Sequence, residues 1–160
     1  MKERKQEAAE KRRGQLQRSL PPNVVVVDNL KDYKDAVCDP SQKLVAVRFH
    51  ATWCKACKAV APAFYRAASK RPDVRFVDVP VSESNAALHQ GLGVPSLPYA
   101  HIYDPKSASS SSGGPSGGGG LVEELKLTRR CIKSFEKRLD SYLNGYCDLS
   151  DEGDFRATEN

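Results

Sequence analysis

Long apolar runs are missing from this sequence of 160 residues. The longest run, residues 24–27 with its neighbours, is far shorter than the roughly 20 residues that a membrane-spanning helix needs. No apolar segment typical of a secretory signal opens the chain. We therefore expect a soluble protein without a membrane partner, whose targeting peptide has been removed or never existed.

The number of cysteines is odd, and it is small for a protein held together by disulfides. The five cysteines are too few and too unevenly spaced for a small secreted scaffold held together by disulfides, and at least one of them must stay unpaired. A reducing compartment therefore fits the sequence better than secretion. The five are Cys38, Cys54, Cys57, Cys131 and Cys147.

The net charge of +5 is not gathered around aromatic or groove-reading segments, so we expect no nucleic-acid partner. Residues 1–20 carry seven Lys or Arg against three Glu, whereas residues 148–160 carry five acids against Arg156. We interpret both ends as solvated segments. The alternative is an electrostatic docking arm for an acidic partner.

Local patterns predict an α/β chain. Strands are expected at residues 24–27, 44–49, 74–79, 97–103 and 121–127, and helices at 29–38, 54–70, 83–90 and from a cap at Thr128 onward. Two parallel βα units followed by an antiparallel pair imply a central mixed sheet flanked by helices on both faces.

Composition divides the chain into three parts. Residues 1–21 form a basic extension, residues 22–146 a folded domain and residues 147–160 an acidic tail. Within the domain, residues 106–120 are mostly Ser and Gly, which is typical of a flexible loop between two strands.

Cys54 and Cys57 stand where a predicted buried strand meets a predicted helix. The free N–H groups and the dipole at a helix N-terminus favour a thiolate on Cys54, and the positive charges of Lys55 and Lys58 act in the same direction. Cys57 lies one helical turn further in. We therefore expect Cys54 to attack a disulfide and Cys57 to resolve the mixed disulfide that results.

Two other interpretations of the cysteine pair remain open. A C-x-x-C pair is also half of a zinc site, but such a site needs a second pair, and the sequence offers only His50, His89 and His101, so we expect no metal. The two cysteines could instead be inert core residues, although Trp53 and the two lysines around them favour a reactive pair.

The segment FHATWCKACK at residues 49–58 resembles the thioredoxin family, as do Pro62 and the Leu97-Pro98 pair before a strand. The resemblance covers about residues 24–143. It implies the thioredoxin fold, a redox-active Cys54–Cys57 disulfide and no cofactor. It also implies a substrate-binding surface around Trp53, Leu97 and Pro98, with a cis peptide bond before Pro98.

Within that family, the sequence looks most like the atypical Cys/His-rich thioredoxins of plastids. The features that carry this likeness are the segment at residues 97–103, Cys131 and the central dipeptide Lys55-Ala56. The likeness implies a chloroplast protein, with the cytoplasm as the alternative. Cys131 is expected to pack in the core and Cys147 to be exposed, while His50 helps shape the site and His89 and His101 are structural.

One departure from the family pattern concerns buried charge. The family usually has an Asp six residues before the first cysteine, where this chain has Arg48, and Asp78 aligns with a position that is usually Lys. We hypothesise a charge-swapped buried pair, because either charge alone in the core would be costly. Asp78 or water would then deprotonate Cys57. Alternatively, Arg48 extends to the surface and Asp78 is exposed.

The expected function is that of a monomeric protein-disulfide reductase. Its partners would be disulfide-containing target proteins, with a thioredoxin reductase or glutathione as electron donor. Lys55 should make the pair less reducing than an ordinary thioredoxin. A redox-sensing binding module and a disulfide isomerase or oxidase are the alternatives.

Overall fold

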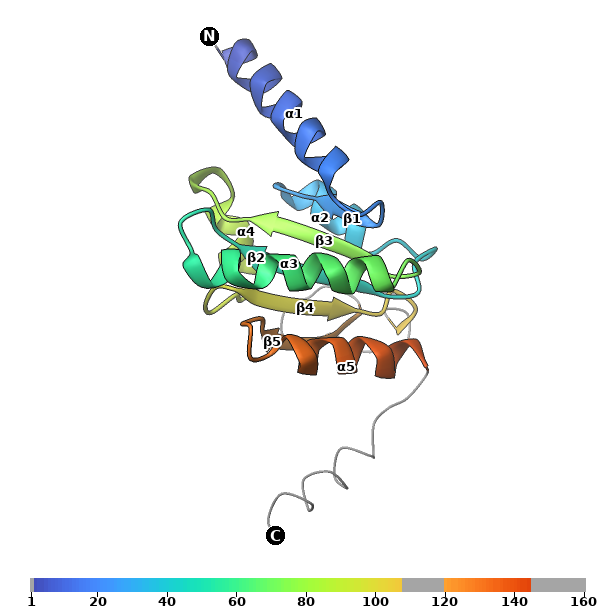
Figure 1. Ribbon diagram of the computed structural model, residues 1–160. Helices are drawn as coiled ribbons and strands as arrows, with labels where there is room; N and C mark the ends of the chain where they lie inside the picture. Colours follow the sequence, from blue (N-terminus) through green and yellow to red (C-terminus); the bar gives the residue numbers. More distant parts are fainter. Residues whose placement is uncertain (1, 108–119, 145–160) are drawn as a thin grey trace.

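A five-stranded sheet organises the protein, as seen in a computed structural model that describes residues 2–107 and 120–144 (Figure 1). The strand order is β1-β3-β2-β4-β5. Strands β1, β3 and β2 pair in parallel, whereas β4 pairs antiparallel with β2 and β5 pairs antiparallel with β4. The predicted mixed sheet is therefore confirmed. The strands are β1 (Val24–Val26), β2 (Val45–His50), β3 (Arg75–Pro80), β4 (Tyr99–Tyr103) and β5 (Leu121–Lys126).

Helices cover both faces of the sheet, as the sequence pattern predicts. One face packs against α3 (Lys55–Lys70) and α5 (Ile132–Leu143), and the other against α2 (Leu30–Val37) and α4 (Ala86–Gly91), which follows a 3₁₀ turn at Glu83–Asn85. In the described ranges, no helix combines the length and the apolar character that crossing a membrane requires.

The predicted cap of the last helix was wrong. Helix α5 begins at Ile132 after Cys131, and Thr128 lies in the preceding turn. That turn is closed by the Cys131 N–H, which donates to the Thr128 carbonyl at 2.9 Å. One separate turn therefore stands between Thr128 and the helix.

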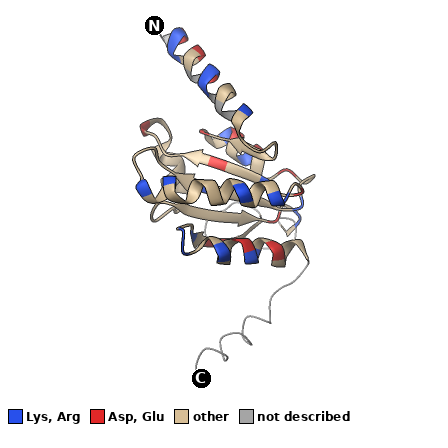
Figure 2. Ribbon diagram, viewed as in Figure 1, with Lys and Arg blue, Asp and Glu red and all other residues tan. Residues whose placement is uncertain are grey.

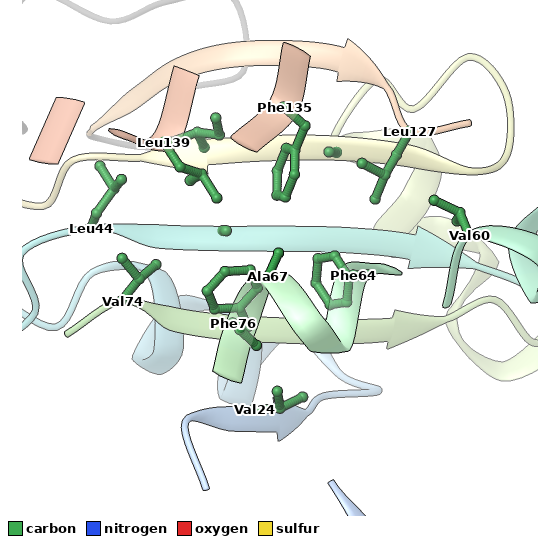
Figure 3. Packing of buried hydrophobic residues seen from close by; sticks show 14 residues of the cluster. Val24, Leu44, Val60, Phe64, Ala67, Val74, Phe76, Leu127, Phe135 and Leu139 are labelled. Atoms are coloured by element: carbon green, nitrogen blue, oxygen red, sulfur yellow. The ribbon is translucent and has the colours of Figure 1, made fainter. Parts of the chain in front are cut away.

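The core between the sheet and α3 with α5 is built around three aromatic rings (Figure 3). The ring centre of Phe64 lies 5.2 Å from that of Phe76 and 6.1 Å from that of Phe135. Buried Ala46 and Ala100 on the central strands leave room for these large side chains. Burial of this cluster fixes α3, and with it the start of α3, against the end of β2.

Helix α1 (Lys2–Ser19) projects away from the sheet (Figure 1). Its described side chains are exposed, in keeping with a segment that has almost no apolar face to bury. Residues 108–119 of the predicted Ser/Gly-rich loop, and all of the predicted acidic tail at 147–160, lie outside the described residues.

His101 lies fully buried on β4, on the face that α2 and α4 cover. Its ring centre is 4.9 Å from that of Phe49 and 6.1 Å from that of Tyr103. Burial lowers the pKa of His101 to about 4, so the imidazole is neutral in the folded protein at neutral pH. His101 is thus a structural residue, held by aromatic packing.

This histidine should make stability depend on pH. A pKa of about 4 in the folded state, against 6.5 for an unperturbed histidine, means that the unfolded chain binds the proton first. Stability should therefore be full above pH 6.5 and fall by up to about 3 kcal/mol as the pH drops to 4. His101→Phe should remove this part of the slope, as measured by urea unfolding between pH 4 and 7. Equal slopes in the two proteins would contradict it.

Candidate functional site

The predicted cysteine pair lies where β2, a central strand, leads into α3. Cys54 is the N-cap of α3, and the Cys57 N–H donates to the Cys54 sulfur at 3.1 Å. The two cysteines form a disulfide, with their Cα atoms 5.2 Å apart. A capping sulfur that accepts a backbone hydrogen bond occupies the position where a helix stabilises negative charge.

The two cysteines differ in how far they reach the surface. Cys54 keeps 8% of its surface exposed and Cys57 only 1%, whereas Trp53 next to them is 73% exposed. Lys55 and Lys58 are exposed on the first turn of α3. The structure therefore makes Cys54 the outer sulfur of the pair, with an exposed aromatic residue before it and two exposed lysines shortly after it in the chain.

The predicted Leu97-Pro98 segment comes to the same place from β4. The peptide bond before Pro98 is cis, as the resemblance implies. Leu97 packs against the small apolar cluster of Ala51, Cys54 and Cys57, and Pro98 is buried. Residues more than 40 positions apart in the chain thus meet at the dithiol.

Arg48 and Asp78 form a buried ion pair between β2 and β3. The two residues are register partners in adjacent parallel strands, and each side chain is only 2% exposed. Arg48 Nε donates to Asp78 Oδ1 at 2.8 Å and Nη2 donates to Oδ2 at 2.9 Å. This bidentate geometry matches the charge-swapped pair of the sequence analysis, and Arg48 does not extend to the surface.

Two further residues complete the hydrogen bonds of the Asp78 carboxylate. His50 Nε2 lies 3.1 Å from Oδ1, and the Tyr65 hydroxyl donates to Oδ2. Arg48 Nη2 also donates to the Tyr65 oxygen at 3.1 Å. We call Arg48, His50, Tyr65 and Asp78 the buried charge cluster.

Sequence reasoning missed Tyr65 and did not pair His50 with Asp78, although signals for both were present. His50 stands two residues after Arg48 in a strand, so both side chains point to one face of the sheet. Tyr65 stands eight residues after Cys57 in a helix, so it lies on roughly the same side two turns later.

The cluster keeps Asp78 ionised. Burial alone would raise its pKa, but hydrogen bonds from His50 and Arg48 and the guanidinium charge hold it well below the usual range. Burial, followed by the charge of Asp78, raises the pKa of Tyr65 far above 10. The guanidinium of Arg48 also lies 5.2 Å from the ring centre of Phe64.

The cluster contacts the cysteine pair through the backbone. Arg48 Nη1 donates to the Cys57 carbonyl oxygen at 3.3 Å. The group nearest the inner cysteine in this network is therefore a cation, with the carboxylate of Asp78 behind it. Arg48 thus links the register of the sheet to the first turn of α3.

The remaining cysteines and histidines lie elsewhere. Cys38 is an exposed free thiol, and Cys131 is half-buried at the cap of α5, where the Thr128 hydroxyl donates to its sulfur at 3.2 Å, rather than in the core. Cys147 lies outside the described residues. His89 is buried beside Phe49. Within residues 2–107 and 120–144, no three His, Cys, Asp or Glu side chains gather in a way that could hold a metal ion.

Removing the carboxylate of the cluster should destabilise the fold strongly. Asp78→Asn leaves a buried guanidinium without its counter-charge, so we expect a loss of about 3–5 kcal/mol in urea unfolding. Asp73→Asn is the matched control, because Asp73 pairs with Lys43 at 3.5 Å on the surface, and it should cost less than about 1 kcal/mol. Arg48→Met/Asp78→Leu should recover much of the loss. Similar effects of Asp78→Asn and Asp73→Asn would refute the expectation.

Comparison with curated proteins finds plastid relatives. Thioredoxin-like 2, chloroplastic, from Oryza sativa subsp. japonica is 34% identical over 87 residues, which are 54% of this chain and 40% of that protein. Thioredoxin-like 1-3, chloroplastic, from Arabidopsis thaliana is 27% identical over 135 residues, 84% of this chain and 45% of that protein. The chain thus spans less than half the length of these two relatives.

Solved structures share the fold at low sequence identity. Thioredoxin f2 from Chlamydomonas reinhardtii matches with a TM-score of 0.57 and 24% identity, covering 72% of this chain and 94% of the other. A structure of ferredoxin:thioredoxin reductase with thioredoxin f2 matches with a TM-score of 0.60 and 19% identity, covering 74% and 93%. The family model for Thioredoxin matches residues 24–126, from β1 through β5. That match covers well over half of the chain, which also has a thioredoxin fold and a disulfide between Cys54 and Cys57. The chain therefore belongs to the thioredoxin family.

Proposed function

We propose that this protein is a thiol–disulfide oxidoreductase that reduces disulfides in other proteins. The observation that carries the proposal is the disulfide between Cys54 and Cys57 at the N-terminus of α3, with the outer sulfur beside the exposed ring of Trp53. An outer nucleophile and an inner partner one turn away are what a two-step exchange needs.

The exchange moves two electrons from the dithiol to the target. The Cys54 thiolate attacks one sulfur of the target disulfide, and the other target sulfur leaves as a thiolate and takes a proton. Cys57 then loses its proton and attacks the Cys54 sulfur of the mixed disulfide, which frees the second target thiol. The protein is left with the Cys54–Cys57 disulfide, and a thioredoxin reductase or glutathione must reduce it again.

The surroundings of Cys54 suit the attacking role. The Cys57 N–H already points at the Cys54 sulfur at 3.1 Å, and the dipole of α3 and the charges of Lys55 and Lys58 favour the thiolate. Trp53 and Leu97 provide the apolar surface against which an extended target segment binds, next to the buried Pro98.

The buried charge cluster has a positioning role in this proposal. Asp78 stays ionised, and its carboxylate oxygens accept hydrogen bonds from Arg48, His50 and Tyr65. It therefore does not take the proton of Cys57 at neutral pH. Water, the other acceptor that the sequence allows, therefore takes the proton of Cys57. Arg48 holds the backbone of Cys57 in place for its attack.

The relatives support a compartment and an electron donor for this proposal. Because two relatives carry chloroplastic names, we place this protein in the plastid. There, a ferredoxin-linked reductase such as the one in the complex with thioredoxin f2 is a suitable donor.

Substitution of each cysteine tests the two roles. Cys54→Ser should abolish dithiothreitol-driven reduction of insulin, because the nucleophile is gone. Cys57→Ser should accumulate a mixed disulfide with the target, because resolution is blocked, and this product is detected by mass spectrometry. Cys38→Ser, which removes an exposed thiol outside the site, should retain turnover. Turnover by Cys54→Ser would rule out the proposal.

The direction of transfer is tested by titrating the Cys54–Cys57 couple against glutathione and dithiothreitol buffers. A reductase should show a two-electron potential near or below about −240 mV, and Lys55→Gln should shift it to a lower value, since a thiolate-stabilising cation is lost. A potential near about −180 mV or above would indicate an oxidant or isomerase. An intact couple without any turnover would indicate a redox-sensing binding module.

A further inference from the structure

The outward face of α3 carries a row of cations that runs away from the dithiol. Helix α3 contains no Asp or Glu, and its four basic side chains are all exposed, whereas α5 beside it carries both signs of charge (Figure 2). The spacings of three, eight and four residues between them keep the four on one side of the helix. We call this set the basic row; its members are Lys55, Lys58, Arg66 and Lys70.

The basic row has no counter-charge within the described ranges. None of its members takes part in the ion pairs that the structure shows there. The acids of the neighbouring helix are already engaged, because Arg71 pairs with Glu136 at 3.1 Å and with Asp140 at 2.8 Å. A row of exposed charges that the protein does not neutralise is available to a partner.

The row begins at the reacting sulfur. Lys55 follows Cys54 directly, Trp53 is exposed beside them, and Lys70 lies 15 residues further along the helix. At 1.5 Å per residue, the row extends about 22 Å from the dithiol. A molecule that contacts it therefore also contacts the site of disulfide exchange.

We propose that the basic row is a docking surface for acidic protein partners, whose disulfide lies at one end of a carboxylate-rich surface. The inference rests on the proposed function and adds the class of target. The row fits a protein rather than a nucleic acid, because it starts at a dithiol and only one exposed aromatic ring, Trp53 at its first end, lies beside it in the described residues, whereas a strand of stacked bases needs several.

Helix α1 offers a useful contrast. It is also rich in Lys and Arg, but Glu3, Glu7 and Glu10 repeat along one side of it, and it projects away from the sheet (Figure 1). Its charges therefore partly cancel within the helix, whereas those of α3 do not. This makes α3 the element whose charge can select targets at the dithiol.

Exposed charges act mainly on encounter and orientation. Each pair contributes little alone, so the effect should appear as a lower KM and a faster association that salt screens. Arg66 and Lys70 are the members farthest from the cysteines, so changing them probes docking without altering the exchange chemistry.

The experiment compares two peptides with the same disulfide loop, one followed by four Glu and the other by four Gln. With the full chain and dithiothreitol, kcat/KM at low salt should be about 5- to 10-fold higher for the acidic peptide. Salt at 0.5 M and Arg66→Gln/Lys70→Gln should each remove most of that preference. Lys31→Gln/Lys34→Gln on α2, across the sheet, is the matched control and should keep it.

Binding of the same peptides, read from the fluorescence of Trp53, the single tryptophan, separates the two proposals. Preferred binding of the acidic peptide without reduction of either peptide would refute the proposed function and leave the docking surface standing. Equal binding and equal turnover would overturn the docking surface alone. Displacement of the acidic peptide by a single-stranded oligonucleotide at lower concentration, dependent on Arg66 and Lys70, would also overturn it in favour of a nucleic-acid site.

Discussion

The ion pair between Arg48 and Asp78 is the constraint on which the centre of this structure depends. Two unit charges side by side in the middle of a sheet are tolerated only when each is fully hydrogen-bonded. The parallel register of β2 and β3 brings them together, and Tyr65 and His50 supply the remaining bonds to the carboxylate. A shift of either strand by one residue would send one charge to the opposite face, so the cluster also specifies the register.

The same cluster connects the sheet to the chemistry. Arg48 is the shared element: its guanidinium pairs with Asp78, lies against Phe64 and donates to the carbonyl of Cys57. By resemblance, the family places a carboxylate where Arg48 stands, so this chain presents the opposite charge to the inner cysteine. The start of α3, the redox pair and the core packing are thereby held by one side chain.

Much of the fold could be predicted because its signals are local. Apolar β-branched runs indicated the strands near their observed positions, and the Ser, Gly and Pro clusters separated them. The start of α5 could not be predicted in the same way, because a Thr followed by an amphipathic stretch also fits an isolated turn before the helix. Tyr65 was missed because helical periodicity shows which side of α3 it lies on but not which strand residue it meets.

The sequence by itself determined that a Cys-x-x-Cys pair ends a buried strand and opens a helix, and that a basic helix follows it. These features depend on residues close together in the chain. Only the tertiary structure decided that Asp78, thirty residues after Arg48, accepts hydrogen bonds from Arg48, His50 and Tyr65. It also decided that Leu97 packs against the cysteines. The physical reason is that strand register and helix packing set these contacts, and both are properties of the whole core rather than of any single segment.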